Sequence, residues 1–437
     1  WSIIGASWDS AGVYVFDRDG NVRPGWPVMT AQPVWSSVAC GDIDGDGRME
    51  LVFGSNGNLF YALHEDGTEV RDGDNNPATH GVFKVLGNSF NYATPALADI
   101  DNDGIAEIIY GSFDGKVYAW NADGSNVPGW PALLPTGTTS IGAGGAFTAS
   151  IAVGYLDGAG DTSPEIVCAA SCDSVIVFQA NGGRRPGFPI WVKTAGTSKI
   201  PSPAIADINN DGFNDIVFQS TNGGLYVFTR NGPVIPGFSN LRYSILTNSA
   251  SESSPVVADI NGDGRNDMIV GDEYGLVSAF SGLNGTMMAG FPIQLAGEVR
   301  GAAAAADIDN DGKTEIVISG WDKNVYVWDY DFPFQPNGVA PWPQFHHDAR
   351  RTGFSGAPLF VGVGEDGPGA GTAVRSLEFS PVSPNPAVGK ARMWFAIPSD
   401  LGGATYELSI FDLSGRCVKR VDSGISRPGR FSLEWDL

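Results

Sequence analysis

A nine-residue acidic pattern recurs along the chain, and its cleanest copy runs from Asp42 to Glu50. Oxygen-bearing side chains on alternate residues, a glycine for a sharp turn and a closing carboxylate suit a hard cation such as Ca²⁺. The other copies begin at Asp99, Asp207, Asp259 and Asp307, and a degenerate copy runs from 157 to 165. The pattern therefore predicts five Ca²⁺ sites and leaves a sixth open.

We assign the ligands by position within the pattern: side chains at positions one, three, five and nine, and the backbone carbonyl at position seven. These residues are Asp42, Asp44, Asp46, Arg48 and Glu50; Asp99, Asp101, Asp103, Ile105 and Glu107; Asp207, Asn209, Asp211, Phe213 and Asp215; Asp259, Asn261, Asp263, Arg265 and Asp267; Asp307, Asp309, Asp311, Lys313 and Glu315. The degenerate copy keeps Asp157, Asp161 and Glu165. Asn209 and Asn261 replace an aspartate, which lowers the anionic charge of their loops.

Two other interpretations of the pattern are weaker. An EF-hand needs a glutamate at position twelve between two helices, whereas position twelve of the first copy is Phe53 and the flanks resemble strands. Turns of Asx and Gly also form without metal, but five copies in register argue against chance. Mg²⁺ suits the loops less well, because it prefers a rigid octahedron with several waters.

The elements around each acidic loop form a longer repeat. A short apolar run such as 254–258 precedes a loop, and a strand such as 108–112 follows it. A turn, a third strand such as 117–120 and a Pro-Gly-aromatic-Pro element such as 128–131 come next. Four short strands in a period near fifty residues are typical of β-propeller blades, whereas solenoid repeats are usually shorter.

Seven such hairpins begin near Ser2, Leu51, Ile108, Ile166, Ile216, Met268 and Ile316. The first hairpin has no apolar run and acidic loop before it, so its innermost strand is missing at the start of the chain. Residues 357–363 resemble residues 254–258, and we expect them to supply that strand and close the ring. The prediction is an all-β protein with a seven-bladed β-propeller over residues 1–363.

A second domain is expected after a Gly-rich linker at 364–376. Alternating apolar residues at 391–397, 406–412 and 431–435 fit strands of a small Ig-like β-sandwich over residues 377–437. The chain opens within a strand pattern, which suggests a trimmed piece of a longer secreted precursor whose other domains are possible partners.

Composition narrows the function. The net charge of −23 and the lack of a basic tract argue against nucleic-acid binding. No run of 18 apolar residues predicts a transmembrane segment, and the four cysteines lack the spacing of a metal site or a disulfide framework. His346, His347 and Asp348 have no third ligand at suitable spacing, and no nucleophile motif occurs, so we expect no enzyme activity.

Strand order places the acidic loops and the hairpin tips on opposite faces of the propeller. Several tips pair an aromatic with an acid, as at Trp8-Asp9 and Trp321-Asp322. Such pairs suit a sugar or a protein partner, but turn formation with the aromatic packed on the next blade is the favoured interpretation. The aromatics expected between blades are Trp26, Trp130, Phe188, Phe238, Phe291 and Trp342.

The loops and the strand at 51–55 resemble the FG-GAP (VCBS-type) repeats of bacterial surface proteins, akin to the integrin α-subunit propeller. The resemblance covers residues 1–355, and it implies seven blades, Ca²⁺ in the loops and partner binding on the opposite face. Residues 384–386, 410–416 and 428–436 resemble the Ig-like domain of flagellar hook-capping proteins and type IX secretion sorting modules. That domain normally continues past Trp435-Asp436, so we expect it to be truncated.

These observations favour an extracellular or cell-surface bacterial protein whose Ca²⁺-stabilised propeller acts as a non-catalytic binding or scaffold module of the adhesion type. Its partner is expected to be a protein or a glycan on the face away from the Ca²⁺ loops. The alternatives are a carbohydrate-binding lectin, or the propeller part of a polysaccharide lyase or secreted protease. A lyase needs a basic cluster in a groove, and the 26 Lys and Arg residues are scattered along the chain.

Overall fold

The structure is a computed structural model, and the chain divides into two units, Trp1–Gly364 and Glu365–Leu437. In the first unit it describes residues 2–76, 79–87, 93–135, 149–158, 161–170, 174–192, 201–220, 223–238, 241–242, 253–308, 313–333 and 341–355. In the second it describes residues 378–379, 390–397, 405–411, 417–425 and 429–436. These residues form strands, turns and loops without helices, as the all-β prediction requires.

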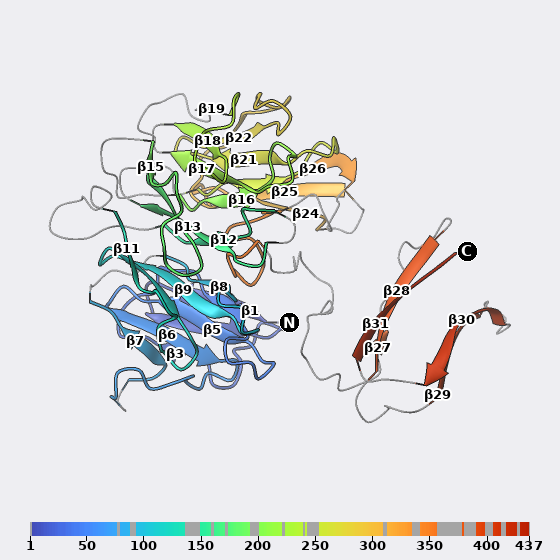
Figure 1. The fold of residues 1–437 in the computed structure, drawn as a ribbon, viewed down its shortest axis with the longest axis horizontal. Helices are drawn as coiled ribbons and strands as arrows, with labels where there is room; N and C mark the ends of the chain where they lie inside the picture. The colour runs from blue at the N-terminus through green and yellow to red at the C-terminus, as the bar shows by residue number, and fades with distance from the viewer. Residues whose placement is uncertain are drawn as a thin grey trace. The chain divides into compact units, whose positions relative to one another are not determined.

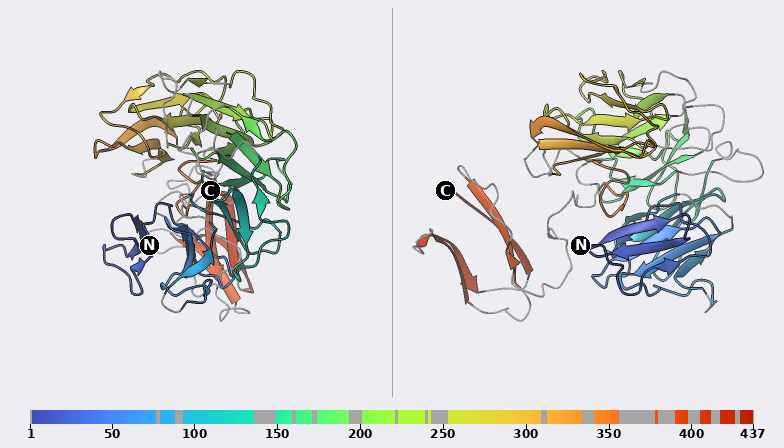
Figure 2. Two further views of the ribbon diagram at one scale, coloured as in Figure 1. Left: turned by 90° about the vertical axis from the view of Figure 1, so that its left-hand side faces the viewer. Right: turned by 180° about the vertical axis from the view of Figure 1, so that it is seen from behind.

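Seven antiparallel sheets follow one another along the described part of the first unit (Figures 1 and 2). Their strands are β1 (Ile3–Ser7), β2 (Gly12–Phe16) and β3 (Val28–Met29); β4 (Ala39–Gly41), β5 (Glu50–Gly54), β6 (Leu59–His64) and β7 (Val82–Val85); β8 (Ala96–Ala98), β9 (Glu107–Ser112), β10 (Lys116–Trp120) and β11 (Ala132–Leu133); β12 (Ala152–Gly154), β13 (Glu165–Ala170), β14 (Ser174–Phe178) and β15 (Ile190–Trp191); β16 (Ala204–Ala206), β17 (Asp215–Ser220), β18 (Gly224–Phe228) and β19 (Leu241–Arg242); β20 (Val256–Ala258), β21 (Asp267–Gly271), β22 (Leu276–Phe280) and β23 (Ile293–Gln294); β24 (Ala304–Ala306), β25 (Lys313–Ser319) and β26 (Val325–Pro333).

The first strand of each four-stranded sheet is short, and in β8 and β16 two alanines flank one larger apolar residue. These inner strands contact one another in the series β4, β8, β12, β16, β20 and β24. Small side chains permit this close approach, while the second strands β9, β13 and β17 are buried along their whole length. This is the arrangement of propeller blades around a centre.

The core lies between successive sheets, where their apolar side chains interdigitate. Ile109 of β9 and Ile166 of β13 belong to one buried cluster, which the Trp130 side chain also joins. The indole N–H of Trp130 donates to the carbonyl of Ala180 in the next sheet at 2.8 Å. Trp26 makes the same bond to the Glu65 carbonyl at 3.0 Å. The inter-blade role predicted for these aromatics is confirmed for Trp26 and Trp130.

The glycine of the Pro-Gly-aromatic-Pro element meets the turn of the next sheet at close range. Gly129 has a φ of +93°, and a Cβ on it would lie 2.0 Å from the carbonyl oxygen of Asn181. On the other side, a Cβ on Gly182 would lie 2.4 Å from the carbonyl oxygen of Gly129. The two backbones therefore touch where only glycine fits. Equivalent pairs are Gly25 with Gly67 and Gly187 with Gly232.

A segment at 341–355 runs through the centre and hydrogen-bonds to inner strands of five sheets. Its bonds are Cys40 N to Arg350 O, Leu97 N to Thr352 O, Val153 N to Gly353 O, Val257 N to Trp342 O and Ala305 N to Pro343 O, all between 2.7 and 2.8 Å. The inter-blade core role predicted for Trp342 is confirmed, because its side chain belongs to one buried cluster with residues of neighbouring sheets. Its backbone pairs with Val257 of β20, because the chain turns into the centre at this point.

The second unit contains five described strands. They are β27 (Glu378–Phe379), β28 (Lys390–Ile397), β29 (Thr405–Phe411), β30 (Cys417–Ile425) and β31 (Gly429–Asp436). One sheet has the order β27-β28-β31 and the other pairs β29 with β30. The three strands predicted from alternation are present, and β30 was not predicted. The described residues of the whole chain contain no helix able to cross a membrane.

Candidate metal loops

Each acidic loop joins an inner strand to the second strand of the same sheet. In the third sheet, β8 ends at Ala98 and β9 begins at Glu107, so the loop occupies the residues between them. The closing carboxylate is the first residue of the second strand in five sheets and the third residue of β25 in the seventh. It is drawn into the core by the strand that follows it, whereas most of the earlier carboxylates stay near the surface. This split places a buried anion beneath a ring of more exposed ones.

The loop from Asp99 to Glu107 brings all four of its predicted carboxylates together. Asp99 accepts the backbone N–H groups of Asn102 at 2.7 Å and Gly104 at 2.9 Å, which folds the loop around its side chain. One oxygen from each of Asp99, Asp101, Asp103 and Glu107 lies within 4.8 Å of the others. Four anionic oxygens at this spacing, without a sulfur or nitrogen donor among them, fit the ligand preference of Ca²⁺.

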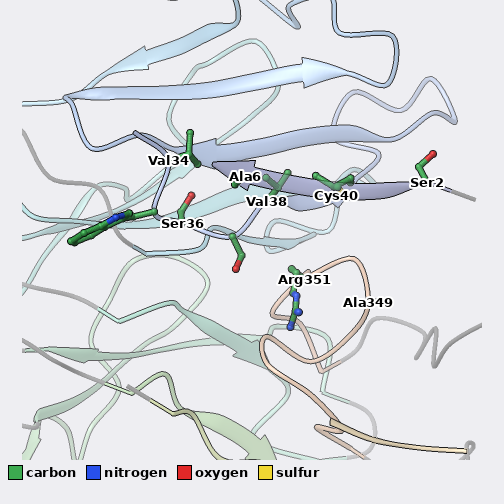
Figure 3. A pocket seen from close by; sticks show the side chains of 11 residues that line it. Ser2, Ala6, Val34, Ser36, Val38, Cys40, Ala349 and Arg351 are labelled. Carbon is green, nitrogen blue, oxygen red and sulfur yellow. The ribbon is translucent and has the colours of Figure 1, made fainter. Parts of the chain in front are cut away.

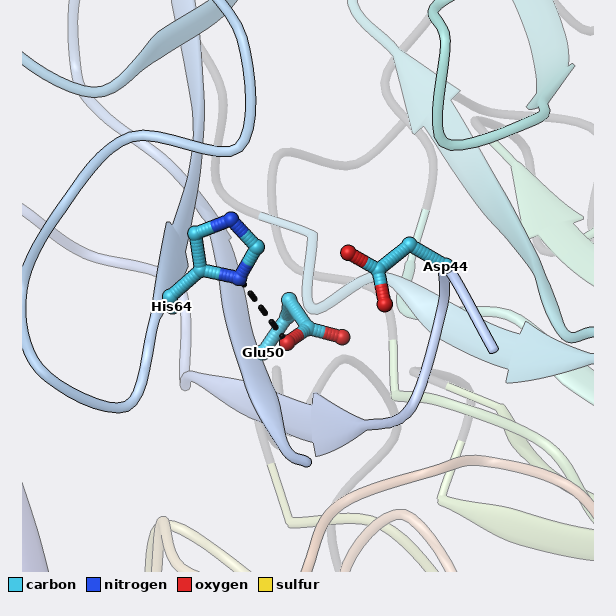
Figure 4. Close-up of side chains that lie close together, drawn as sticks. All are labelled: Asp44, Glu50 and His64. Atoms are coloured by element: carbon cyan, nitrogen blue, oxygen red, sulfur yellow. Dashed lines mark hydrogen bonds and ion pairs between the residues drawn. The ribbon is translucent and has the colours of Figure 1, made fainter. Parts of the chain in front are cut away.

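The first loop folds in the same way, and a residue outside the pattern joins it. Asp42, Asp44 and Asp46 form one group, while Asp44 and Glu50 form another with His64 (Figure 4). His64 Nδ1 lies 3.2 Å from Glu50 Oε1. Sequence reasoning missed His64, although the β5–β6 register places it directly opposite Glu50. Counting residues across the hairpin turn could have found this pair.

Two further loops keep the fold with an asparagine at position three. The side-chain oxygens of Asn209 and Asn261 accept the N–H groups of Asp211 and Asp263, each at 2.9 Å. These loops therefore hold the same shape with one negative charge fewer. In the loop that begins at Asp307, the predicted ligands Asp309 and Asp311 lie outside the described residues. The carbonyl ligands at Arg48, Ile105, Phe213, Arg265 and Lys313 stay a prediction.

All six closing carboxylates are buried, and each accepts a backbone N–H near the start of its loop, from the second residue in five loops and from Leu156, just before Asp157, in the degenerate loop. The pairs are Ile43 with Glu50, Ile100 with Glu107, Leu156 with Glu165, Ile208 with Asp215, Ile260 with Asp267 and Ile308 with Glu315, at 2.7 to 3.2 Å. This shared bond fixes the loop on the second strand. It also accounts for the spacing of the pattern, since position nine must reach back to position two.

Burial without a cation makes these carboxylates weak acids. It raises the pKa of Glu107 to about 8 and those of Glu50, Asp215 and Asp267 to about 7. The neighbouring aspartates of each loop add to the effect, because a like charge disfavours ionisation. A bound divalent cation would remove both penalties. The oxygen-rich donor set and the uncompensated buried charge therefore fit Ca²⁺.

The degenerate loop is different, because an arginine lies among its carboxylates. Arg185 is buried and its Nη2 lies 2.6 Å from Asp157 Oδ1. Its Nη1 lies 3.1 Å from Asp157 Oδ2 and also bonds to Glu165 Oε1. Arg230 Nε is a further 3.5 Å from Asp157 Oδ1. Asp157, Asp161 and Glu165 are thus brought together as predicted. The sequence pattern did not predict the two arginines that contact them, Arg185 and Arg230.

The hairpin-tip face carries exposed aromatic side chains. Trp8 and Trp35 stack with ring centroids 4.5 Å apart and are 44% and 52% exposed. Trp321 is 63% exposed, and the Arg300 guanidinium lies 3.8 Å from its ring centroid. The favoured interpretation, in which tip aromatics pack on the next blade, is confirmed for Trp8, whose ring stacks on Trp35 ahead of β4 of the next sheet. It was wrong for Trp321, whose ring contacts Arg300, ahead of β24 of its own sheet. Both rings have faces available to a ligand.

A cavity of about 420 Å³ lies beside Trp35, between β1 and the central segment (Figure 3). Ala6, Ser36, Cys40 and Arg351 are among the residues that line it. Within the described residues β1 pairs only with β2, whereas the equivalent strand of every later sheet also pairs with an inner strand. The cavity therefore lies along the side of β1 where an inner strand is lacking.

The histidine pair is part of the central segment and is not accessible. His346, His347 and Asp348 are all buried. Asp348 accepts the Thr352 hydroxyl at 2.9 Å and the Arg350 N–H at 2.9 Å. Burial lowers the pKa of His346 to about 4, which keeps its ring neutral. These contacts hold the turn of the segment.

Comparison with known proteins supports the repeat and the fold. Residues 207–270 match the family of FG-GAP-like repeats. Sqt1 of Saccharomyces cerevisiae is similar in structure, with a TM-score of 0.52, 15% identity and coverage of 90% of this chain and 89% of that chain. The biofilm matrix protein Bap1 of V. cholerae has a TM-score of 0.51, 11% identity and coverage of 79% and 77%. No match was found among the curated proteins.

Proposed function

We propose that the chain is a Ca²⁺-stabilised, non-catalytic binding or scaffold module of a secreted or surface protein. The observation that carries this proposal is the separation of two features along each second strand. The acidic loop with its buried carboxylate lies at one end, and the hairpin tip lies at the other. Metal binding can thus stabilise the fold while the opposite face stays free for a partner.

The finer architecture belongs to the same proposal. The seven sheets serve as blades of one closed propeller akin to that of integrin α-subunits, and Glu365–Leu437 contains an Ig-like β-sandwich of the sorting type. Residues 357–363 lie outside the described residues, so their role as the closing strand stays a prediction. The cavity beside β1 supports it, because a strand is required there to complete the first sheet.

A lectin is the second candidate, and the Trp8–Trp35 pair favours it. Tryptophan faces provide large apolar area with a polar edge, which suits the apolar face of a sugar ring. Ser36 lines the adjoining cavity, although its hydroxyl already bonds to Gly54. A protein partner would use the same exposed rings as anchors.

The metal proposal is tested by isothermal titration of the EDTA-treated protein with Ca²⁺ and with Mg²⁺. We expect heat and stoichiometric binding for Ca²⁺ and weaker binding for Mg²⁺. Glu107→Gln should lower the number of bound Ca²⁺ ions by one, since it removes the buried ligand of the second loop. Equal titrations for the wild type and this variant would contradict the assignment.

The ligand face is tested on a glycan array with the Ca²⁺-loaded protein. A lectin should bind defined glycans, and the double variant Trp8→Ala/Trp35→Ala should lose that binding. Trp191→Ala is the matched control, because Trp191 is 50% exposed on the outer strand β15. Loss in both variants would point to general damage. If the wild type binds no glycan on the array, the lectin proposal fails and the protein-binding scaffold is the remaining proposal.

A further inference from the structure

We infer that the loop from Asp157 to Glu165 does not bind Ca²⁺, because Arg185 supplies its cation from within the chain. This inference rests on the proposed Ca²⁺ binding of the other loops. Arg185 donates to both oxygens of Asp157 and to Glu165, the first and last carboxylates of the loop. These are the positions at which a bound metal ion would be held in the other copies.

The position of Arg185 in the repeat is what brings the guanidinium there. Its backbone N–H donates to Val177 of the third strand β14, the bond that Val127, Ile235 and Met288 make in three other sheets. At this position those sheets carry an apolar side chain beside their acidic loops. The fourth sheet carries an arginine beside the loop of altered length, in which the closing carboxylate lies nine residues from its N–H donor instead of seven. The arginine and the altered loop therefore occur together.

All three nitrogens of the Arg185 guanidinium have a hydrogen-bond partner, whereas Asp161 Oδ2 is buried without one. Arg185 Nε donates to the Arg230 carbonyl at 2.9 Å, so the guanidinium is anchored as well as paired. The planar guanidinium meets Asp157 with two parallel bonds, so both oxygens of this carboxylate are engaged. A Ca²⁺ ion could enter only by displacing a buried cation from two carboxylates. The remaining acid, Asp161, offers too little charge to drive that exchange.

Metal counting on full-length variants tests the inference. Asp99→Asn and Asp157→Asn change the first carboxylate of the second loop and of the degenerate loop. After dialysis against Ca²⁺ and elemental analysis, Asp99→Asn should bind one ion fewer than the wild type. Asp157→Asn should bind the same number. A loss of one ion in Asp157→Asn would overturn the inference.

Stability in EDTA gives a second readout that needs no metal. Arg185→Met installs the side chain found at Met288, and it should lower Tm in EDTA by several degrees. Arg184→Met, an exposed neighbour, should leave Tm unchanged. Arg185→Lys keeps the positive charge but loses the two-pronged guanidinium, so its Tm in EDTA should lie between those of Arg185→Met and Arg184→Met. An unchanged Tm for Arg185→Met would overturn the inference.

The ion count and the Tm in EDTA distinguish failure of the proposed Ca²⁺ binding from failure of the inference about Arg185. If the wild type binds no Ca²⁺ at all, the proposed metal function fails, yet the EDTA comparison still reports on Arg185. If Arg185→Met does not fold, the ion count of Asp157→Asn decides the matter alone.

Discussion

The second loop (Asp99 to Glu107) and the degenerate loop (Asp157 to Glu165) both bury a closing carboxylate, but they differ in which cation could neutralise it. In the loop from Asp99 to Glu107, four carboxylates converge and the described contacts include no basic side chain. In the loop from Asp157 to Glu165, three carboxylates converge and Arg185 lies against two of them. In both loops a backbone N–H near the start of the loop, from Ile100 or from Leu156, donates to the closing carboxylate. Both loops therefore bury a carboxylate beside the second strand. The cation that neutralises this carboxylate can be a metal ion from solution or an arginine of the chain.

Metal removal should have the largest effect. Each site occupied at a hundredfold excess over its Kd contributes about 2.7 kcal/mol, so five sites together amount to roughly 13 kcal/mol. We expect EDTA to lower Tm by more than about 10 °C, measured by differential scanning fluorimetry. EDTA saturated beforehand with Ca²⁺ is the control. An unchanged Tm in EDTA would remove the basis of the comparison.

The metal-free protein should lose stability as pH rises. The folded-state pKa values of Glu50, Glu107, Asp215 and Asp267 lie at about 7 to 8, above their unfolded values. Their contribution is complete below about pH 4 and disappears as pH passes through 7 to 8, by up to about 1.4 kcal/mol per group and pH unit.

This loss is checked by Tm at several pH values in EDTA and in Ca²⁺. The fall between pH 5 and 8 should be steep in EDTA and shallow in Ca²⁺, since the cation compensates the ionised carboxylates. Parallel profiles in the two buffers would show that Ca²⁺ does not contact these groups.

Substitution of the closing carboxylate should affect stability differently in the two loops. Glu165→Gln removes a buried partner of Arg185, which costs about 3 kcal/mol with or without Ca²⁺. Glu107→Gln resembles the protonated acid, so it should be nearly neutral in EDTA and destabilising in Ca²⁺. Urea unfolding in both buffers measures the difference. Identical Ca²⁺ dependence of the two variants would break the comparison.

The smallest effects concern two glycines whose backbone is left-handed. Gly129 and Gly104 have φ values of +93° and +92°, but a Cβ on Gly104 would meet nothing within 4 Å. Gly104→Ala should cost about 1 kcal/mol for the left-handed backbone. Gly129→Ala should cost more, because its Cβ also meets Asn181. Urea unfolding should show a larger loss of unfolding free energy for Gly129→Ala than for Gly104→Ala. Equal losses would mean that the backbone near Asn181 moves aside at little cost.

Much of the fold could be predicted because the repeat is local. Period, turn residues and alternation placed the hairpins at β1–β2, β5–β6 and their equivalents, as well as the loops between strands. The carboxylates of the second loop converge as their spacing required. Such features depend on residues within one sheet, so the sequence of that sheet is sufficient to predict them.

The contacts that were missed join residues distant in the chain. His64 and Arg185 reach their loops across a hairpin turn, and neither belongs to the acidic pattern. The turn of Trp342 into the centre depends on space left by inner strands of other sheets. The exposure of Trp8 and Trp321 depends on what the neighbouring sheets cover. His64 and Arg185 lie in the same repeat as their loops, so counting across the hairpin could have found them, whereas the contacts of Trp342, Trp8 and Trp321 depend on other parts of the chain.

The central segment has a consequence for the order in which the molecule can form. The six inner strands β4 to β24 all precede residues 341–355, so a growing chain completes its sheets before any of these central bonds can form. Closing such long loops is slow and brings its gain only at the end. A nascent chain therefore has its sheets without the bonds of the central segment until residues 341–355 have been synthesised. Once that segment is in place, loosening one sheet disturbs the bonds of the others, and the sheets become a single cooperative unit.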